Sequence, residues 1–264
     1  MFTEEALRTR LPIGGLGLPL HFFESVGSTN DVALDLAQRG APHGTLVVAD
    51  AQTRGRGRGT RRWETPAGTS LALSVLLRPR LIAVEGAWGF GVAGAMAVVE
   101  AMEMEGAAAA IKWPNDVLVG GRKAAGLLVD AVWEGEQLEA AIVGIGVNVL
   151  DGSAPPDGQV DYPATSLQAA LGRAVDRSTL LLAILEALAR WLPRVGSADL
   201  RQAWWQTMAY RDEWVSVEER GRELRGRLAG IDADGGVILQ TANGETMKVG
   251  AGGGRLRPID KASE

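Results

Sequence analysis

The chain has 264 residues, which is enough for one large domain or for one large and one small domain. Hydrophobic residues make up 46% and charged residues 22% of it, as in a globular protein with a substantial core. There is no cysteine, and the only histidines are His21 and His43, so disulfides, thiolate nucleophiles, cysteine-type zinc sites and multi-histidine metal centres are excluded. The net charge of −5 argues against a general nucleic-acid surface and confines any anion site to a local basic cluster.

No targeting or membrane-spanning pattern is evident. The N-terminus is acidic and lacks the charged-then-apolar order of a signal peptide. The longest uncharged apolar run, residues 86–99, is too short to span a bilayer and predicts a buried core helix. We therefore predict a cytoplasmic protein that does not interact with membranes.

The first half of the chain mixes predicted strands and helices. Residues 1–20 are expected to form a loose lead-in. Ser28-Thr29-Asn30 begins a helix, because a hydroxyl residue can cap its N-terminus, and Gly40 ends it. A mostly apolar helix is predicted at 81–104. Strands are predicted at 21–25, 45–49 and 70–77.

The following part predicts a sheet made of short strands joined by tight turns, which favours mixed or antiparallel pairing. These strands lie at 108–112, 116–119, 126–133 and 138–148. A loop rich in proline, glycine and aspartate follows at 151–163, and two capped amphipathic helices are predicted at 178–192 and 197–209.

From about Trp214 the pattern changes to a small β module of the SH3-like or barrel type. Its predicted strands lie at 214–218, 223–231, 237–240 and 245–249. The predicted fold class is α+β, with a mixed or antiparallel sheet and packed helices followed by this SH3-like β-barrel domain. The predicted division is a lead-in at 1–20, a main domain at 21–212 and a C-terminal domain at 213–264.

The segment from Gln52 to Trp63 carries the strongest signal for function. It contains five arginines interleaved with three glycines, and no acidic residue. Glycine lets backbone N–H groups approach an anion closely, and arginine adds fixed charge and forked donors. One interpretation is a flexible RG-type segment that binds nucleic acid, and the other is an ordered loop that holds a phosphate or carboxylate. The flanking strands, Trp63 and the acidic protein favour the ordered loop.

A second signal is Lys112-Trp113-Pro114-Asn115-Asp116. The Trp-Pro step restricts the backbone next to a lysine at a strand end, and a lysine ammonium suits a phosphoryl group. Asn115 and Asp116 would orient this lysine or cap the turn. The alternative is a surface lysine beside a β-turn.

Three further segments are ambiguous when each is taken alone. Residues 121–126 place Lys123 near glycines, either at a ligand or at a solvated hairpin tip. Residues 144–148 put glycine within a strand, which marks either the close approach of a ligand or a bulge. The helix start at Ser28 is first of all a cap, although its free N–H groups could also bind a polar ligand.

Taken together and in this order, these segments resemble the biotin protein ligases (biotin–acetyl-CoA-carboxylase ligases), from about residue 21 to the C-terminus. The combination of the Gly-Arg-Gly loop with Lys-Trp-Pro-Asn-Asp is highly specific to that family. The matching motifs are Ser28-Thr29-Asn30, 52–63, 112–116, Arg122-Lys123-Ala-Ala-Gly126-Leu-Leu-Val129, 144–148 and Ala164-Thr-Ser-Leu167.

The resemblance implies a two-step reaction. The carboxylate of biotin attacks the α-phosphate of ATP to give biotinyl-5′-adenylate and pyrophosphate, and a lysine of a biotin carboxyl carrier domain then displaces AMP. Both substrates bring negative charge into one site, so cations and Mg²⁺ are needed to screen it. The implied metal is Mg²⁺ carried by ATP, with no protein ligand assigned. The implied partner is the carrier domain of a biotin-dependent carboxylase.

The resemblance also implies residue roles. Lys112, Arg56 and Arg58 are the implied catalytic groups, with Lys112 bridging the biotin carboxylate and the α-phosphate. Contacts with biotin are implied for Ser28, Thr29, Asn30, Gln52, Gly55, Arg56, Lys112, Gly126 and Gly144. Contacts with ATP or the adenylate are implied for Arg56, Gly57, Arg58, Arg61, Trp63, Lys112, Asn115, Lys123 and Asn148.

The loop departs from the family pattern at two places. Arg54 stands where alanine is usual, and Gly59-Thr60 replaces a more usual Arg-Gly pair. We expect the loop to be disordered without ligand and to order over the adenylate.

Further expectations concern DNA binding, dimerisation and alternative functions. The twenty leading residues are too few for the winged helix of the family's repressor members, so no operator DNA binding is expected. Exposed strands such as 138–148 could pair in a homodimer. The alternatives to a biotin ligase are a lipoate or octanoate ligase or transferase of related fold, and a non-catalytic RG-type nucleic-acid-binding protein.

Overall fold

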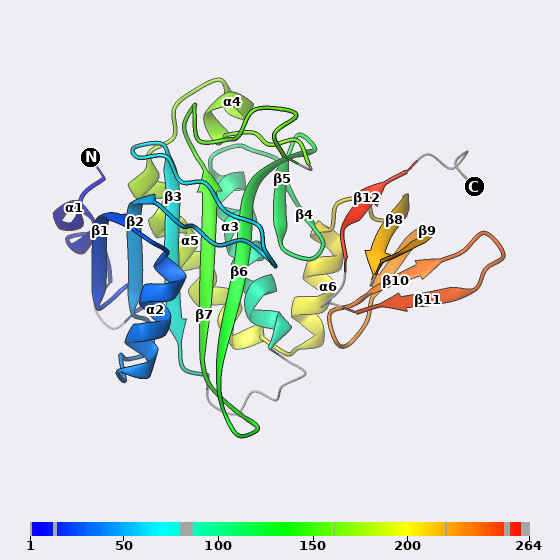
Figure 1. The fold of residues 1–264 in the computed structure, drawn as a ribbon, viewed down its shortest axis with the longest axis horizontal. Coiled ribbons are helices and arrows are strands. Elements are labelled where there is room, and N and C mark those ends of the chain that lie inside the picture. Colours follow the sequence, from blue (N-terminus) through cyan, green and yellow to red (C-terminus); the bar gives the residue numbers. More distant parts are fainter. Residues whose placement is uncertain are drawn as a thin grey trace.

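A seven-stranded mixed sheet forms the centre of the molecule (Figure 1). The computed structural model describes residues 2–12, 15–79, 87–160, 162–219, 221–250 and 254–259. The strand order is β1-β2-β3-β7-β6-β5-β4, with β1 and β2 parallel and every other pair antiparallel. The strands are β1 (Leu20–Val26), β2 (Leu46–Gln52), β3 (Ser70–Leu77), β4 (Ala109–Lys112), β5 (Asp116–Val119), β6 (Arg122–Glu134) and β7 (Gln137–Asn148). The predicted mixed sheet is therefore confirmed.

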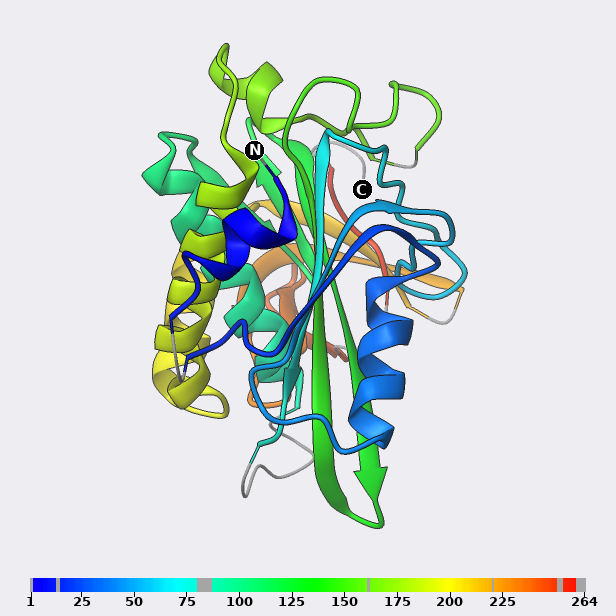
Figure 2. The same cartoon turned by 90° about the vertical axis from the view of Figure 1, so that its left-hand side faces the viewer.

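Helices cover both faces of this sheet, which explains its apolar central strands. Figure 2 shows α2 (Thr29–Gln38) on one face, and α3 (Trp88–Met104) and α5 (Arg177–Trp191) on the other. Every residue of β3 is buried, because a strand with helices on both sides needs apolar side chains in both directions. The start of the predicted helix at 81–104 lies partly outside the described residues.

Helix α3 packs closely on the sheet through a glycine. A Cβ added at Gly94 would lie 2.7 Å from Cδ2 of Leu127 and 3.0 Å from Cγ1 of Val143. Phe90, Met102 and most other residues of this helix are also buried, so it is a core helix as predicted. Among the described residues, no helix combines the length and apolar character that crossing a bilayer requires.

The lead-in packs more tightly than expected. It contains helix α1 (Glu4–Arg8), which Thr3 caps by accepting a hydrogen bond from the N–H of Ala6. Leu7, Leu11 and Leu16 are all buried in the main core. The prediction of a loose segment was wrong, because these leucines give it an apolar surface that is buried against the sheet and helices.

A second, five-stranded antiparallel sheet follows helix α6 (Ala198–Thr207) and has the order β11-β10-β9-β8-β12. It confirms the predicted SH3-like β domain, although the described strands have open edges and form no closed barrel. The sequence did not predict β12. The strands are β8 (Trp214–Glu219), β9 (Arg222–Ile231), β10 (Val237–Gln240), β11 (Thr246–Val249) and β12 (Leu256–Pro258). The remaining short elements are α4 (Leu167–Leu171) and the 3-10 turn Leu192–Arg194.

Tryptophans join the two sheets. The fully buried Trp113 donates from Nε1 to the carbonyl of Gly235, in the turn between β9 and β10, at 3.1 Å. Trp88 stacks on Trp204 with ring centroids 5.6 Å apart, and a Cβ added at Gly235 would lie 2.8 Å from the Trp88 ring. Because Trp113 follows Lys112 directly, this contact fixes the backbone beside that lysine.

The strand predicted as a pairing edge lies inside the sheet. Strand β7, which contains residues 138–148, pairs with β3 on one side and with β6 on the other. Its backbone groups are therefore already used, and it is not an edge that a second chain could extend. The edges of the described main sheet are β1 and β4.

The Trp113–Gly235 contact predicts a measurable stability loss. Trp113→Phe keeps a buried ring but leaves the Gly235 carbonyl without this donor, and we expect it to lower the free energy of unfolding by about 1 kcal/mol. Urea titration followed by fluorescence and circular dichroism measures this. Trp133→Phe, at a side chain that is 37% exposed on β6, is the control and should change little. Equal stabilities of the two variants would contradict the proposed link.

Candidate active site

A cavity of about 410 Å³ lies where strands β6 and β7 meet the N-terminus of α2, the arginine loop and the turn between β4 and β5. The loop around Tyr162 and strand β12 of the second sheet complete its wall. The residues predicted from sequence that line it are Ser28, Thr29, Asn30, Gln52, Arg56, Gly57, Arg58, Arg61, Trp63, Lys112, Asn115, Lys123, Gly126, Gly144 and Asn148. Segments that are far apart in the sequence therefore meet at one site.

Gly55 is placed differently from the other predicted residues, because it supports the loop and does not line the cavity. Its carbonyl accepts a hydrogen bond from the N–H of Trp63 at 3.0 Å. A Cβ at this position would lie 2.2 Å from the Trp63 carbonyl oxygen. The loop can close on itself only because residue 55 has no side chain.

The arginine loop is folded as a hairpin-like flap. The N–H of Gly57 donates to the carbonyl of Arg61 at 2.8 Å, and bridges join Arg56 to Arg62 and Gln52 to Thr65. Gly59 has a φ of 67° at the tip, so the glycine that departs from the family pattern supplies the left-handed residue of the turn. The expected disorder without ligand stays a prediction, and this hairpin gives the contacts that ordering would form.

The other departure, Arg54, anchors the start of the flap. Its N–H donates to the carbonyl of Gly27 at 2.8 Å. Its guanidinium lies over Gly27, where an added Cβ would be 3.2 Å from Nη2. Arg54 is thus directed to the end of β1 and is not among the residues that line the cavity.

Two lysines share one carboxylate at the floor of the site. Asp116 lies 3.3 Å from Nζ of Lys112 and 2.5 Å from Nζ of Lys123. Lys112 and Asp116 are each only 6% exposed. Lys112 ends β4 and Asp116 begins β5, and these two residues are partners in the antiparallel register, so the tight turn itself brings the charges together. Asp116 thus orients the lysine, which is one of the two roles expected from the sequence.

Burial and the neighbouring charges shift the pKa values of both Lys112 and Asp116. Burial lowers the pKa of Lys112; Asp116 opposes this, and Lys123 and Arg61 lower it further. Burial alone would raise the pKa of Asp116, but the charges and hydrogen bonds of Lys123 and Lys112 outweigh it and hold that pKa below its ordinary value. The pocket therefore keeps an excess of positive charge that an anionic ligand would neutralise.

Tyr162 covers Lys112. Nζ of Lys112 lies 4.7 Å from the centre of the tyrosine ring, within cation–π range. The hydroxyl of Tyr162 donates to the carbonyl of Gly121 at 3.0 Å and is hydrogen bonded to the hydroxyl of Tyr210. Burial and the bond to Tyr210 raise the pKa of Tyr162, so it stays neutral beside the lysine.

Trp63 lies over two strand glycines. A Cβ at Gly146 would be 2.3 Å from the Trp63 indole, and one at Gly126 would be 3.1 Å from it. Nζ of Lys123 lies 5.4 Å from the indole ring. The indole nitrogen is buried against Gly146 and has no hydrogen-bond partner among the described residues.

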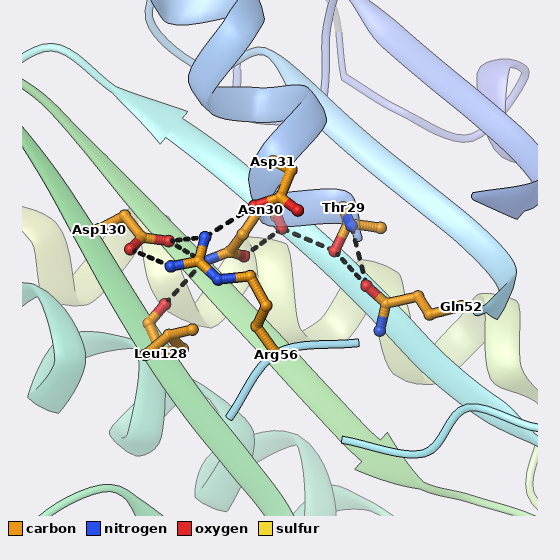
Figure 3. A network of polar contacts seen from close by, with 8 residues as sticks. Thr29, Asn30, Asp31, Gln52, Arg56, Leu128 and Asp130 are labelled. Atoms are coloured by element: carbon orange, nitrogen blue, oxygen red, sulfur yellow. Dashed lines mark hydrogen bonds and ion pairs between the residues drawn. The ribbon is translucent and has the colours of Figure 1, made fainter. Parts of the chain in front are cut away.

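A polar network holds the N-terminus of α2 at the other end of the site (Figure 3). Gln52 accepts hydrogen bonds at Oε1 from the N–H of Thr29 at 2.8 Å and from its hydroxyl at 3.2 Å. Ser74 lies 2.8 Å from the Thr29 hydroxyl and donates to Oδ1 of Asn30 at 2.6 Å. Ser28 occupies the cap position but its side chain makes no capping hydrogen bond, while Gln52 accepts from the N–H of Thr29, the first residue of the helix.

Gly144 is explained by this network. A Cβ there would lie 2.0 Å from Oδ1 of Asn30, so the asparagine side chain fills the space that the glycine leaves. The register shift between β6 and β7 falls at Val132/Trp133 and not at the glycines. A bulge at the strand glycines is therefore wrong, and the groups that approach them in this structure are the Asn30 and Trp63 side chains, while the approach of a ligand stays a prediction.

The arginines of the flap differ in their surroundings. Arg56 forms hydrogen bonds with Asp130 and Asp31. Arg58 faces the cavity, and burial together with the nearby Arg61 lowers its pKa. Nε of Arg61 donates to the carbonyl of Arg58 at 3.2 Å. Only part of the loop's positive charge is therefore directed at a ligand.

The two asparagines predicted as nucleotide contacts also support the site's backbone. Nδ2 of Asn115 donates to the carbonyl of Leu127 at 2.6 Å. Nδ2 of Asn148, at the end of β7, donates to the carbonyl of Thr165 at 3.2 Å. Each ties a neighbouring segment to the cavity wall while remaining part of its lining.

No group of three or more His, Cys, Asp or Glu side chains that could hold a metal occurs in the described part of the chain. Asp116 is the carboxylate closest to the cations, and both of its oxygens already contact lysines. A metal brought in on a phosphate ligand would therefore have few protein ligands here.

Sequence reasoning missed several residues of the site. Asp130, Ser74 and Tyr162 gave no motif, and Arg257 belongs to an unpredicted strand of the second sheet. Asp130 did carry a signal, because it is a charged residue in an otherwise apolar predicted strand. Gly146 also carried a signal, as the second of two alternate glycines on β7.

Comparison with known proteins agrees with this arrangement. The Biotin/lipoate A/B protein ligase family matches residues 22–148, and the Biotin protein ligase C terminal domain matches residues 213–253. A biotin–[acetyl-CoA-carboxylase] ligase of Paracoccus denitrificans is 40% identical over 229 residues, which cover 83% of this chain and 93% of that protein. The bifunctional ligase/repressor BirA of Bacillus spizizenii is 34% identical over 250 residues, covering 92% of this chain and 75% of BirA.

Solved structures are similar as well. The biotin protein ligase from Aquifex aeolicus in complex with biotin and ATP has a TM-score of 0.76 and 28% identity, covering 91% of this chain and 99% of that one. Its fold therefore extends across both sheets described above. The sequence relatives, both family matches and this structural similarity show that the chain belongs to the biotin protein ligase family.

Proposed function

We propose that this chain activates biotin with ATP to form biotinyl-5′-AMP and then transfers biotin to a lysine of a biotin carboxyl carrier domain. The observation that carries the proposal is the convergence of Lys112, Lys123 and Arg58 on one largely buried cavity. Attack of a carboxylate on a phosphate brings two anions together, and cations in a site shielded from water favour that encounter. The Aquifex aeolicus structure contains biotin and ATP in a protein of the same fold.

Lys112 is the group that we assign to the reacting atoms. Its ammonium is held between Asp116 and the ring of Tyr162, so its position is fixed before a ligand binds. A unit charge about 4 Å from a developing charge is worth roughly 4 kcal/mol at an effective dielectric near 20. This corresponds to about 10³ in rate if the interaction exists only in the transition state.

We assign the biotin end to the α2 side of the cavity. The Thr29–Gln52 pair offers hydroxyl and amide groups to a polar ring, and Gly126 and Gly144 keep the adjacent wall free of side chains. Contacts from Ser28 and Asn30 belong to the same proposal. Gly55 acts indirectly, through the fold of the flap.

The adenylate end is assigned to the flap and the end of β7. Trp63 offers an indole face, and Asn148 lies at the cavity wall beside it. Arg58 and Arg61 are the flap cations placed for a phosphate, together with Lys123. Gly57 and Asn115 complete this assignment as backbone and amide contacts.

Mg²⁺ is proposed to enter bound to ATP. It would supply further charge screening for the triphosphate, and the described residues do not need to form a metal site of their own. Asp116 is the nearest carboxylate that could contact its hydration shell.

The remaining parts of the proposal concern organisation. We propose a lead-in at 1–20, a catalytic domain at 21–212 and an SH3-like domain at 213–264, a cytoplasmic location, and no operator binding. The biotin-dependent carboxylase partner follows from the names of the relatives, and a homodimer remains a proposal whose interface would involve surfaces other than β7.

The two alternatives are less well supported. A lipoate ligase is not favoured, because the named relatives and the ligand-bound structures concern biotin. A flexible RG-type nucleic-acid binder is not favoured, because the loop is folded and part of it lines the cavity. Competition between biotin and lipoate for ATP-dependent activation separates the first alternative from the main proposal.

The role of Lys112 predicts a large loss of adenylation. Lys112→Ala should reduce biotin-dependent pyrophosphate release about 10³-fold, because the cation beside the reacting atoms is lost. The fold should survive, since Asp116 keeps its contact with Lys123. Lys248→Ala, at an exposed lysine on β11, is the matched control and should match wild type. Equal rates for Lys112→Ala and wild type would refute the assignment.

The lowered pKa of Lys112 predicts a pH effect. The reaction needs the charged ammonium, which is present below the pKa and is lost as the pH rises through it, so activity should fall at a pH below the pKa of a free lysine. Asp116 holds that pKa up, and Asp116→Asn should therefore shift the fall to lower pH. Pyrophosphate release measured from pH 7 to 10 tests this, and a shift to higher pH or no shift would contradict it.

A further inference from the structure

Arg56 is held by carboxylates from two different elements (Figure 3). Its Nη2 lies 2.9 Å from Oδ1 of Asp130, and its Nη1 lies 3.1 Å from Oδ2 of Asp130 and 2.8 Å from Oδ1 of Asp31. Asp130 lies on β6, and Asp31 lies in the first turn of α2. We call Arg56, Asp31 and Asp130 the loop latch, because together they join the flap to the strand and the helix that flank the cavity.

The geometry of the latch is that of a strong contact. The Arg56–Asp130 pair is bidentate, which matches the guanidinium fork to both carboxylate oxygens. The Asp130 side chain is only 19% exposed and that of Arg56 37%, so water screens the pair incompletely. Burial opposes the charge of Arg56, but Asp130 and Asp31 outweigh it and raise the pKa of Arg56.

The carboxylate of Asp130 is itself held in place. Nδ2 of Asn30 donates to its Oδ2 at 2.8 Å and also lies 3.4 Å from the carbonyl of Leu128. Oδ1 of Asn30 accepts from Ser74, and Gly144 leaves the space for the asparagine. The latch is therefore a rigid receptor for one arginine, positioned by three strands and a helix.

This placement leaves Arg56 with a different task from its neighbour. Arg56 and Arg58 both line the cavity, but the guanidinium of Arg56 is already neutralised by two carboxylates. Three of the five N–H donors of Arg56 are already used by these carboxylates, so a phosphate would meet a charge that is largely paired. Opening of the flap would break the same three hydrogen bonds, so the state of the latch and the state of the flap are linked.

We propose that Asp130 and Asp31 are positioning residues that hold the flap closed by binding Arg56, and that Arg56 serves as the latch while Arg58 meets the phosphate. The effect of the latch on the reaction rests on the proposed function. A closed flap would retain the adenylate between the two steps, and the strength of the latch would set how fast the intermediate escapes.

Limited trypsin digestion tests the latch without relying on catalysis, because the flap contains five arginines. Asp130→Asn keeps the side-chain shape but removes its charge, and we expect about tenfold faster initial cleavage within residues 54–63. Arg56→Lys should have a similar effect, because an ammonium lacks the fork but leaves the number of trypsin sites unchanged. Combining the two changes should add little, since each breaks the same pair.

The control is Asp35→Asn. Asp35 lies one turn along α2 from Asp31 and has similar exposure. It forms an ion pair of 3.0 Å with Arg39, which is not part of the flap. It should leave flap cleavage unchanged. Cleavage at residues 222–227 of the second sheet, measured in the same digest, reports general unfolding. Asp31→Asn, at an exposed position, provides a second latch variant that does not alter the buried strand.

Wild-type flap cleavage rates in both Asp130→Asn and the Asp31→Asn/Asp130→Asn double variant would overturn the latch. Its link to the reaction is measured separately, as the rate at which biotinyl-adenylate leaves the enzyme in the absence of carrier. We expect about tenfold faster release from Asp130→Asn with a smaller change in the rate of adenylate formation. Unchanged release despite faster cleavage would overturn the retention role, whereas failure of the wild-type enzyme to form adenylate would refute the proposed function and leave the protease result standing.

Discussion

The site depends on one buried carboxylate that two lysines share. Placing two ammonium groups in a largely dry cavity is unfavourable, because each loses hydration and repels the other. Asp116 offsets this by contacting both, and its position follows from its antiparallel pairing with Lys112 across a tight turn. The arrangement carries one net positive charge on three ionised groups, so it is stable without ligand and still attracts an anion.

The remaining structure keeps that triad in place. Trp113 is tied to the second sheet through Gly235, and Tyr162 is tied to Tyr210 close to where that sheet begins. The C-terminal sheet therefore supports the backbone beside the lysine through Gly235 and also contributes Arg257 to the cavity wall. The small β domain therefore has a structural role: it forms part of the cavity wall and holds the backbone beside Lys112.

Much of this could be predicted from sequence where the physical cause is local. Strand β3 was predicted to the residue from the partial alternation of Ser70–Leu77, and it is buried throughout, including Ser70 and Ser74. The Lys112–Asp116 contact was also within reach, since both ends of a tight turn lie together. The contacts of Asp130, Ser74 and Tyr162 could not be predicted, because each residue acts through partners 41 to 100 residues away that only the tertiary fold brings near. Strand β12 was missed because three residues carry too little pattern.

The five arginines that first drew attention to the flap are not equivalent. Arg54 is bound to the end of β1, Arg56 to Asp130 and Asp31, and Arg61 to the carbonyl of Arg58, whereas the structure places Arg58 and Arg62 in the cavity lining. Composition suggested one basic cluster for one anion, but most of these charges hold the flap itself. The loop must close over a charged intermediate and later release it. Its closed state therefore needs contacts within the protein, because a loop held only by the ligand would open whenever the charge of the ligand changed. Separating the arginine that closes the loop from the arginine that meets the phosphate satisfies this requirement with two residues of the same type placed two positions apart.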